Sequence, residues 1–245
     1  MTLAIIGGTG LSSLSGLDII EQIVIDTPFG APSSVLSIGK LQGNSVIFLP
    51  RHGVEHTIPP HKINYRANMW ALHSMGVKQI IAIAAVGGLR DDMSPGVLAV
   101  PDQIIDYSYG REQSFFSDNF TADKHLDFTY PYDEALRQDI LQAGENQQIA
   151  LVDGGCYGAT QGPRLETAAE IKRMVQDGCA MVGMTGMPEA YLARELMMSY
   201  ATCALSVNWA AGLTSGTITM EQIEQILAGG MEQVKQLLVE LIQSQ

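Results

Sequence analysis

The sequence predicts an α/β fold: a single domain spanning residues 1–245, in which a mixed, mostly parallel β-sheet is flanked by helices. Two observations carry this prediction. Short apolar runs bounded by Gly, Pro or Asp are typical of buried strands, and stretches with apolar residues at helical spacing lie between several of them. This alternation favours a sheet covered on both faces, with ligands bound at the carboxyl ends of its strands.

The predicted strands are apolar runs too short to be helices. They span Leu3–Ile6, Ser45–Leu49, Gln79–Ala85, Val97–Val100 and Ala201–Val207. Glycine or polar residues follow several of these runs directly, which places those residues at strand ends.

Four segments have the periodicity of helices. Tyr65–Met75 and Thr167–Gln176 each end close to a glycine, which is a common helix stop. A third helix is predicted from Pro188 through Met198. The last, Met220–Ile242, has an apolar stripe suited to packing on a sheet, and Gly229-Gly230 is a place where it could bend.

The segment from Arg111 to Tyr132 has little periodicity and is too long for an ordinary turn. We interpret it as an ordered loop that contributes to a subunit contact or to a site.

Composition narrows the class of function. With 46% hydrophobic and 16% charged residues the chain can bury a large core, and its net charge of −12 disfavours nucleic acid and anionic membranes as partners. The three cysteines have no metal-type spacing, and their odd number argues against a closed disulfide framework, so a reducing compartment fits best. The N-terminal apolar run is too short for a signal peptide, and no stretch is long enough to span a membrane. We therefore expect a cytoplasmic protein that acts on a small molecule.

Two motifs near the N-terminus have the chemistry of an anion site. In Gly7-Gly8-Thr9-Gly10 the glycines let backbone amides approach an anion, and the Thr9 hydroxyl adds a donor. Arg51 and His52 follow the second predicted strand, where arginine could grip phosphate with its fork of donors and histidine could donate as well. A plain turn and a solvated loop with incidental histidines remain the alternatives.

Three later motifs also end strands or precede helices. Glu166, close to a predicted helix start, could accept the N1 hydrogen of a 6-oxopurine, or could simply complement the helix dipole. Thr185 precedes a helix and could help to hold an anion, whereas the neighbouring Met184 could be a core residue. The Asn208 amide suits the O6 and N7 edge of hypoxanthine, although an asparagine there is also a common turn residue.

The order of these motifs is more specific than any one of them. GGTG, RHG with HTIPPHKINYRAN, GGLR, TQGPRLET, GMTGMPEA and a strand ending in asparagine together resemble the trimeric purine nucleoside phosphorylase and 5'-methylthioadenosine phosphorylase family. The resemblance covers nearly the whole chain. It implies a nucleoside phosphorylase fold and a pentosyltransferase activity in purine salvage.

The resemblance also implies the roles of individual residues. The phosphate site falls on Thr9, Arg51, His52, Ala84, Ala85 and Thr185, and the purine site on Leu165, Glu166, Asn208 and Ala210, with Met184 under the ribose. Tyr65 lies in a stretch that helps to frame the sugar. The residues expected to act in catalysis are Asn208, Glu166 and His52. Ala84 stands where the family commonly has a hydroxyl, so one phosphate donor is missing.

The departures from the family pattern suggest a substrate. Methylthioadenosine enzymes carry two aspartates where this chain has Asn208 and Ala210, and a small hydroxyl residue where it has Glu166, so a 6-oxopurine is implied. Enzymes for a free 5'-hydroxyl place a histidine where this chain has Met220, near Ile218 and Ile223. These three apolar side chains suit a methylthio group, although core packing is the alternative.

The expected reaction is phosphorolysis of 5'-methylthioinosine to hypoxanthine and 5-methylthioribose 1-phosphate, with no metal or organic cofactor. Three alternatives stay open: an inosine and guanosine phosphorylase, a methylthioadenosine phosphorylase, and a purine-binding protein without activity. Family members are trimers in which a neighbouring loop closes the site, and the loop implied here is the segment around His125 and Phe128.

Overall fold

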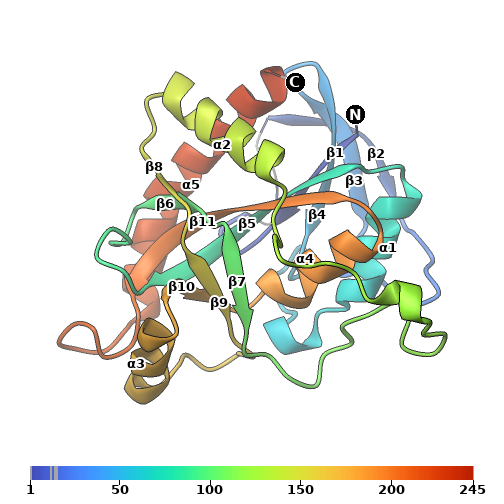
Figure 1. The fold of residues 1–245 in the computed structure, drawn as a ribbon. Coiled ribbons are helices and arrows are strands. Elements are labelled where there is room, and N and C mark those ends of the chain that lie inside the picture. The colour runs from blue at the N-terminus through green and yellow to red at the C-terminus, as the bar shows by residue number, and fades with distance from the viewer. Residues whose placement is uncertain (1, 12, 14–15, 245) are drawn as a thin grey trace.

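The computed structural model of the chain describes residues 2–11, 13 and 16–244. A central sheet with helices on both faces forms the core, as Figure 1 shows. Both parallel and antiparallel strand pairs occur, and the pairs at the centre are parallel. The predicted α/β class and the mixed, mostly parallel sheet are confirmed.

The centre of the sheet consists of strands predicted from the sequence. β4 (Asn44–Pro50), β1 (Leu3–Gly7), β5 (Gln79–Gly88) and β11 (Ser199–Trp209) lie side by side in that order, all parallel. β6 (Leu98–Val100) pairs antiparallel with β11. Because the four central strands are parallel, their carboxyl ends meet at one edge of the sheet.

Six further strands have no counterpart in the sequence-based prediction. They are β2 (Leu17–Ile23), β3 (Leu36–Leu41), β7 (Gln103–Asp106), β8 (Leu151–Asp153), β9 (Cys156–Ala159) and β10 (Cys179–Gly183). β2 is mostly exposed and β8 has three residues, so neither presents an apolar run. β10 does present one, bounded by Gly178, and the sequence contained enough signal to identify it.

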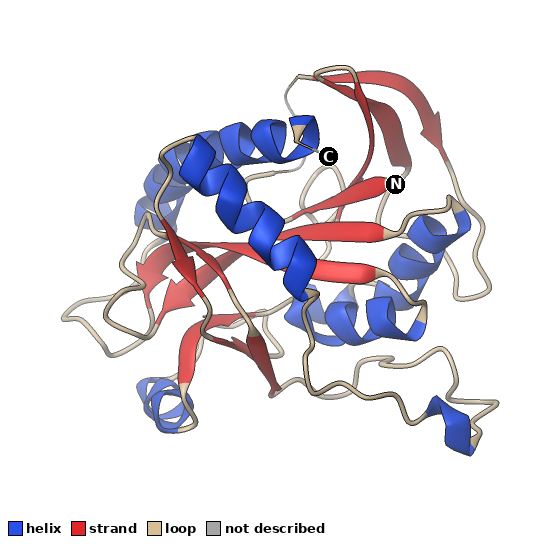
Figure 2. Ribbon diagram, turned by 45° about the horizontal axis from the view of Figure 1, so that its top comes forward, coloured by secondary structure: helices blue, strands red, loops and turns tan. Residues whose placement is uncertain are grey.

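Two helices cover each face of the sheet (Figure 2). α1 (Tyr65–Ser74) and α4 (Gly186–Glu195) pack on the face that carries Ala4 and Ile6 of β1. The opposite face, with Leu3 and Ile5, is covered by α5 (Met220–Gln243) and by α2 (Glu134–Asn146), a helix absent from the prediction. α3 (Ala168–Gln176) lies against β10. Because successive side chains of β1 point to opposite faces of the sheet, this strand contributes to the hydrophobic core on each face.

Two details of the helices differ from expectation. α4 ends at Glu195 rather than Met198, because Met197 has a positive φ of 54°, and its first turn contains the non-helical Met187. α5 runs without interruption through Gly229-Gly230. A side chain at Gly230 would lie 2.4 Å from Leu205 of β11, so this glycine lets the helix approach the sheet closely.

Candidate active site

One cavity of about 400 Å³ lies where the central strands end. Its lining draws on the segments that follow β1, β4, β10 and β11 and on the last residues of β5. The residues predicted to form the phosphate site, the purine site and the apolar 5' edge line it, as does Met184, whereas Tyr65 does not: the lining contains Thr9, Arg51, His52, Ala84, Ala85, Leu165, Glu166, Met184, Thr185, Asn208, Ala210, Ile218, Met220 and Ile223. The fold thus brings these residues together, and their roles remain predictions.

Arg51 is held by a carboxylate that the sequence did not suggest. Its Nε and Nη2 each donate to Glu189 at 2.7 Å, and its Nη1 donates to the Ile83 carbonyl at 2.9 Å. Both members of the ion pair are buried. Burial lowers the pKa of Arg51, but Glu189 outweighs that effect and raises it above the usual value. The pair of Arg51 donors that we expected to bind phosphate therefore binds Glu189. An anion in the cavity would contact the N–H groups of Arg51 that remain.

His52 lies beside Arg51 as a neutral ring. Its Nδ1 donates to the Ile58 carbonyl at 2.8 Å, so Nε2 is the acceptor of the pair. Burial, with a smaller effect of the Arg51 charge, lowers the pKa of His52 to about 4. At neutral pH the ring therefore presents an acceptor, where the sequence led us to expect a donor, and suits a protonated phosphate oxygen.

This depressed pKa predicts a stability effect. Between pH 6.5 and about 4 the unfolded chain binds a proton at His52 that the folded chain does not, so folding stability falls as the pH decreases. In His52→Asn the amide can replace the Nδ1 donor without titrating. From pH 7.5 to 5.0 we expect this variant to lose about 2 kcal/mol less unfolding free energy than the wild type. Urea unfolding at fixed protein concentration measures it, and equal losses in both proteins would contradict the assignment.

Hydroxyls and backbone surround the same end of the cavity. The Thr9 hydroxyl lies 3.5 Å from Nε2 of His56, which also lines the cavity. Thr185 is the N-cap of α4, yet its side chain makes no capping bond there. Gly8 must lack a side chain, since a Cβ would lie 2.3 Å from the Ile83 carbonyl oxygen. Two threonines and the edge of Arg51 thus form a site suited to an anion.

The lining of the cavity also contains a carboxylate and an amide. Glu166 is half-buried, and its Oε1 accepts a hydrogen bond of 2.6 Å from the Thr160 hydroxyl. Asn208 donates through Nδ2 to the Trp209 carbonyl at 2.7 Å, which leaves Oδ1 and a second N–H. Leu165 is 44% exposed at the rim, and Ala210 is buried. A carboxylate and an amide therefore face the space in which a planar ring could lie.

An apolar edge completes the lining. Ile218 precedes α5, and Met220 and Ile223 lie in its first turn. Ile223 is buried, whereas Met220 is 62% exposed. No histidine stands among these three residues, so this edge offers no side-chain partner to a hydroxyl group.

Sequence reasoning missed the residues that hold others in place. Glu189 fixes Arg51, and Thr160 contacts Glu166. Arg111 donates to the carbonyls of Thr160, Gln161 and Met187, which joins two turns of the site. Tyr65, expected to frame the sugar, is buried in the core and donates to the Pro60 carbonyl.

The segment around His125 and Phe128 extends away from the sheet, as Figure 2 shows for the loop with the short helix Ala122–Lys124. Phe128 packs edge-on against Tyr191. Within the described residues, no part of 111–132 lines the cavity. Among all the residues that the structure describes, no group of three or more His, Cys, Asp or Glu side chains is arranged to hold a metal ion. No helix in these residues is long and apolar enough to cross a membrane.

The chain resembles known proteins over almost its full length. The model of the phosphorylase superfamily matches residues 2–243. A relative from Pseudomonas syringae pv. tomato named "Probable S-methyl-5'-thioinosine phosphorylase" is 51% identical over 239 residues, which cover 98% of this chain and 97% of the relative. The 6-oxopurine nucleoside phosphorylase of Pyrococcus furiosus is 40% identical over 245 residues, or 98% of this chain and 91% of the relative.

Solved structures are similar as well. Methylthioadenosine phosphorylase from Schistosoma mansoni, in complex with adenine, superposes with a TM-score of 0.93 at 30% identity, covering 99% of this chain and 91% of that one.

Proposed function

Because the chain belongs to the phosphorylase superfamily, we propose that it catalyses phosphorolysis of 5'-methylthioinosine, with hypoxanthine and 5-methylthioribose 1-phosphate as products. The observation that carries the proposal is a single cavity lined by three chemically different sets of residues. One set suits an anion, one contains Glu166 and Asn208, and one is apolar. A phosphate, a 6-oxopurine and a methylthio group need these three environments.

Phosphate binds among Thr9, Arg51, His52 and Thr185 in this proposal. One of its oxygens forms a bond to C1' as the C1'–N9 bond breaks, and the bonding electron pair leaves with the purine, which takes a proton from solvent. Positive charge develops on the ribose, and the adjacent anion stabilises it. Catalysis then rests on positioning and electrostatics, with neither a covalent enzyme intermediate nor a cofactor.

The purine is recognised by its hydrogen-bonding edge. Glu166 accepts N1–H of hypoxanthine, and the Asn208 amide offers a donor to O6 and an acceptor to N7 once N7 is protonated. Adenine carries an acceptor at N1, which would face the carboxylate of Glu166. This contrast supports methylthioinosine over methylthioadenosine.

The 5' end separates the proposal from its nearest alternative, an inosine and guanosine phosphorylase. Relatives named 6-oxopurine nucleoside phosphorylases support a 6-oxopurine base, which the proposal and this alternative have in common. Ile218, Met220 and Ile223 offer no partner to a 5'-hydroxyl, and an unpaired polar group costs about 1–3 kcal/mol once the loop of a neighbouring copy buries this edge. We expect kcat/KM to be roughly 10 to 100 times higher for methylthioinosine than for inosine.

The quaternary structure is part of the proposal. A homotrimer would place the loop around His125 and Phe128 of one copy over the cavity of the next. The protruding course of that loop in the single chain supports this arrangement (Figure 2).

Base release in the presence and absence of phosphate tests the proposed reaction. We expect methylthioinosine to yield hypoxanthine and the sugar 1-phosphate in equal amounts, with no release when phosphate is omitted. A purine-binding protein without activity would bind hypoxanthine and release none from the nucleoside. Equal kcat/KM for inosine and methylthioinosine would support the general 6-oxopurine alternative.

A further inference from the structure

The backbone of Thr160 is fixed on both sides. The residue follows β9, and its N–H donates to the Gly183 carbonyl at the end of β10 at 2.8 Å. Its own carbonyl accepts a 3.0 Å hydrogen bond from Nη2 of Arg111. The side chain is buried, since the residue is 8% exposed. A β-branched side chain on an immobilised backbone has few alternative rotamers, so the position of the hydroxyl is determined by the fold.

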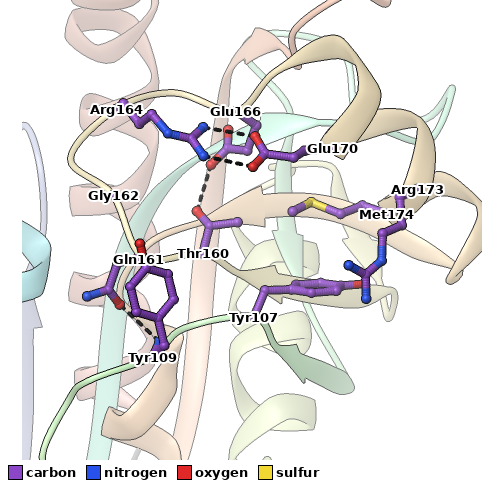
Figure 3. Close-up of a pocket in the computed structure, with 10 residues that line it drawn as sticks. All are labelled: Tyr107, Tyr109, Thr160, Gln161, Gly162, Arg164, Glu166, Glu170, Arg173 and Met174. Atoms are coloured by element: carbon purple, nitrogen blue, oxygen red, sulfur yellow. Dashed lines mark hydrogen bonds and ion pairs between the residues drawn. The ribbon is translucent and has the colours of Figure 1, made fainter.

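The Thr160 hydroxyl points at Glu166, as Figure 3 shows. Its Oγ1 lies 2.6 Å from Oε1 of Glu166 and 3.3 Å from the Gly183 carbonyl oxygen, which already accepts the Thr160 N–H. The shorter contact indicates that the hydroxyl proton goes to the carboxylate, and hydrogen bonds to a charged acceptor are the stronger kind.

The nearby cation is engaged elsewhere. Arg164 donates to both carboxylate oxygens of Glu170, at 2.8 and 2.9 Å, rather than to Glu166 (Figure 3). A second cavity of about 140 Å³ lies on this side, and Thr160 and Glu166 both line it. Glu166 also lines the larger cavity, whereas Thr160 does not. Thr160 therefore stands behind Glu166, out of reach of a ligand in the larger cavity.

We propose that Thr160 is a positioning residue for base specificity: its hydroxyl holds Oε1 of Glu166, so that the carboxylate presents its other oxygen to the purine as an acceptor. This inference rests on the proposed function. A carboxylate held as an acceptor pairs with N1–H of a 6-oxopurine and opposes the N1 lone pair of a 6-aminopurine. Released from Thr160, Glu166 could turn toward solvent and lose that discrimination.

Replacing the hydroxyl tests the proposal. We expect Thr160→Val to lower kcat/KM for methylthioinosine roughly 10-fold, mainly through KM, and to leave the low kcat/KM for methylthioadenosine unchanged or higher. Thr160→Ser keeps the hydroxyl and should restore the ratio of the two values to within about 3-fold of the wild type. Thr202→Val makes the same change in a buried threonine of β11 outside both cavities, and should leave the ratio unchanged.

A double-mutant cycle separates positioning from a general structural effect. If Thr160 acts through Glu166, Thr160→Val should change the ratio less than 2-fold when Glu166 is already Gln. An equal effect in both backgrounds, or a normal ratio in Thr160→Val alone, overturns the proposal. Calorimetry of free hypoxanthine and free adenine binding to the wild type and to Thr160→Val measures the effect of the same contact on base affinity, without turnover. Failure of the wild type to cleave methylthioinosine thus refutes the proposed function, whereas unchanged base affinities in Thr160→Val refute the role of Thr160.

Discussion

Glu189→Gln is expected to lower the free energy of unfolding by about 3–5 kcal/mol, the usual cost of leaving one member of a buried ion pair without its partner. The Arg51 and Glu189 side chains are 1% and 0% exposed, so water cannot replace the missing charge. In glutamine an NH₂ group also replaces one of the two carboxylate oxygens, so that a donor faces an N–H donor of Arg51. The Tyr200 hydroxyl, which donates to Glu189 at 2.8 Å, loses a charged acceptor as well. Urea unfolding at pH 7.5 measures the loss.

Asp92→Asn is the matched control. Arg90 donates to both oxygens of Asp92 at 2.7 and 2.8 Å, a geometry close to that of Arg51 and Glu189, but both side chains are partly exposed. We expect this change to cost less than about 1 kcal/mol. Equal costs in the two variants would contradict the view that burial makes the Arg51 pair important.

Inorganic phosphate should partly rescue Glu189→Gln. If the anion binds beside Arg51, it supplies the negative charge that the variant lacks, and a ligand that binds only the folded state raises stability by mass action. The increase in unfolding free energy between zero and saturating phosphate should therefore be larger in the variant than in the wild type. An increase in neither protein would remove Arg51 from the phosphate site.

Asn208→Asp is expected to change the ratio of kcat/KM for the two bases by roughly 100-fold, because a buried polar group that faces a mismatched partner costs up to about 3 kcal/mol. The carboxylate offers no donor to O6 of hypoxanthine but can accept from the 6-amino group of adenine. The value of kcat/KM should fall for methylthioinosine and rise for methylthioadenosine. The ratio of the two values is the measurement, since loss of folded protein cancels from it.

Asn44→Asp provides the same chemical change at an exposed position, the first residue of β4, away from the cavity. It should leave the ratio unchanged. An unaltered ratio in Asn208→Asp would mean that Asn208 does not contact the base.

The sequence sufficed for the residues that come directly after buried strands. Arg51 and His52 follow β4, Asn208 lies at the end of β11, and all three were identifiable because apolar runs mark the strands and parallel strands share an edge. The family resemblance added Glu166 and the apolar group around Met220, which periodicity alone does not single out. These residues meet in one cavity.

Contacts between distant segments could not be predicted in this way. Glu189 lies 138 residues from Arg51, and a glutamate in the first turn of a helix is already explained by the dipole. Thr160 precedes Glu166 by six residues, but whether its hydroxyl faces that carboxylate depends on how β9 pairs with β10. Both interactions depend on tertiary packing, which local patterns do not encode.

The central claim is that Glu166 and Asn208 select a 6-oxopurine. The most direct test is phosphorolysis by the wild-type protein of methylthioinosine and methylthioadenosine, at equal concentration and saturating phosphate. The two substrates differ only in the group at the 6 position of the base and in the hydrogen on N1 that accompanies the oxo group. We expect kcat/KM to be at least about 100-fold higher for methylthioinosine. Equal values, or faster cleavage of methylthioadenosine, would contradict the assignment of this pair to the purine edge.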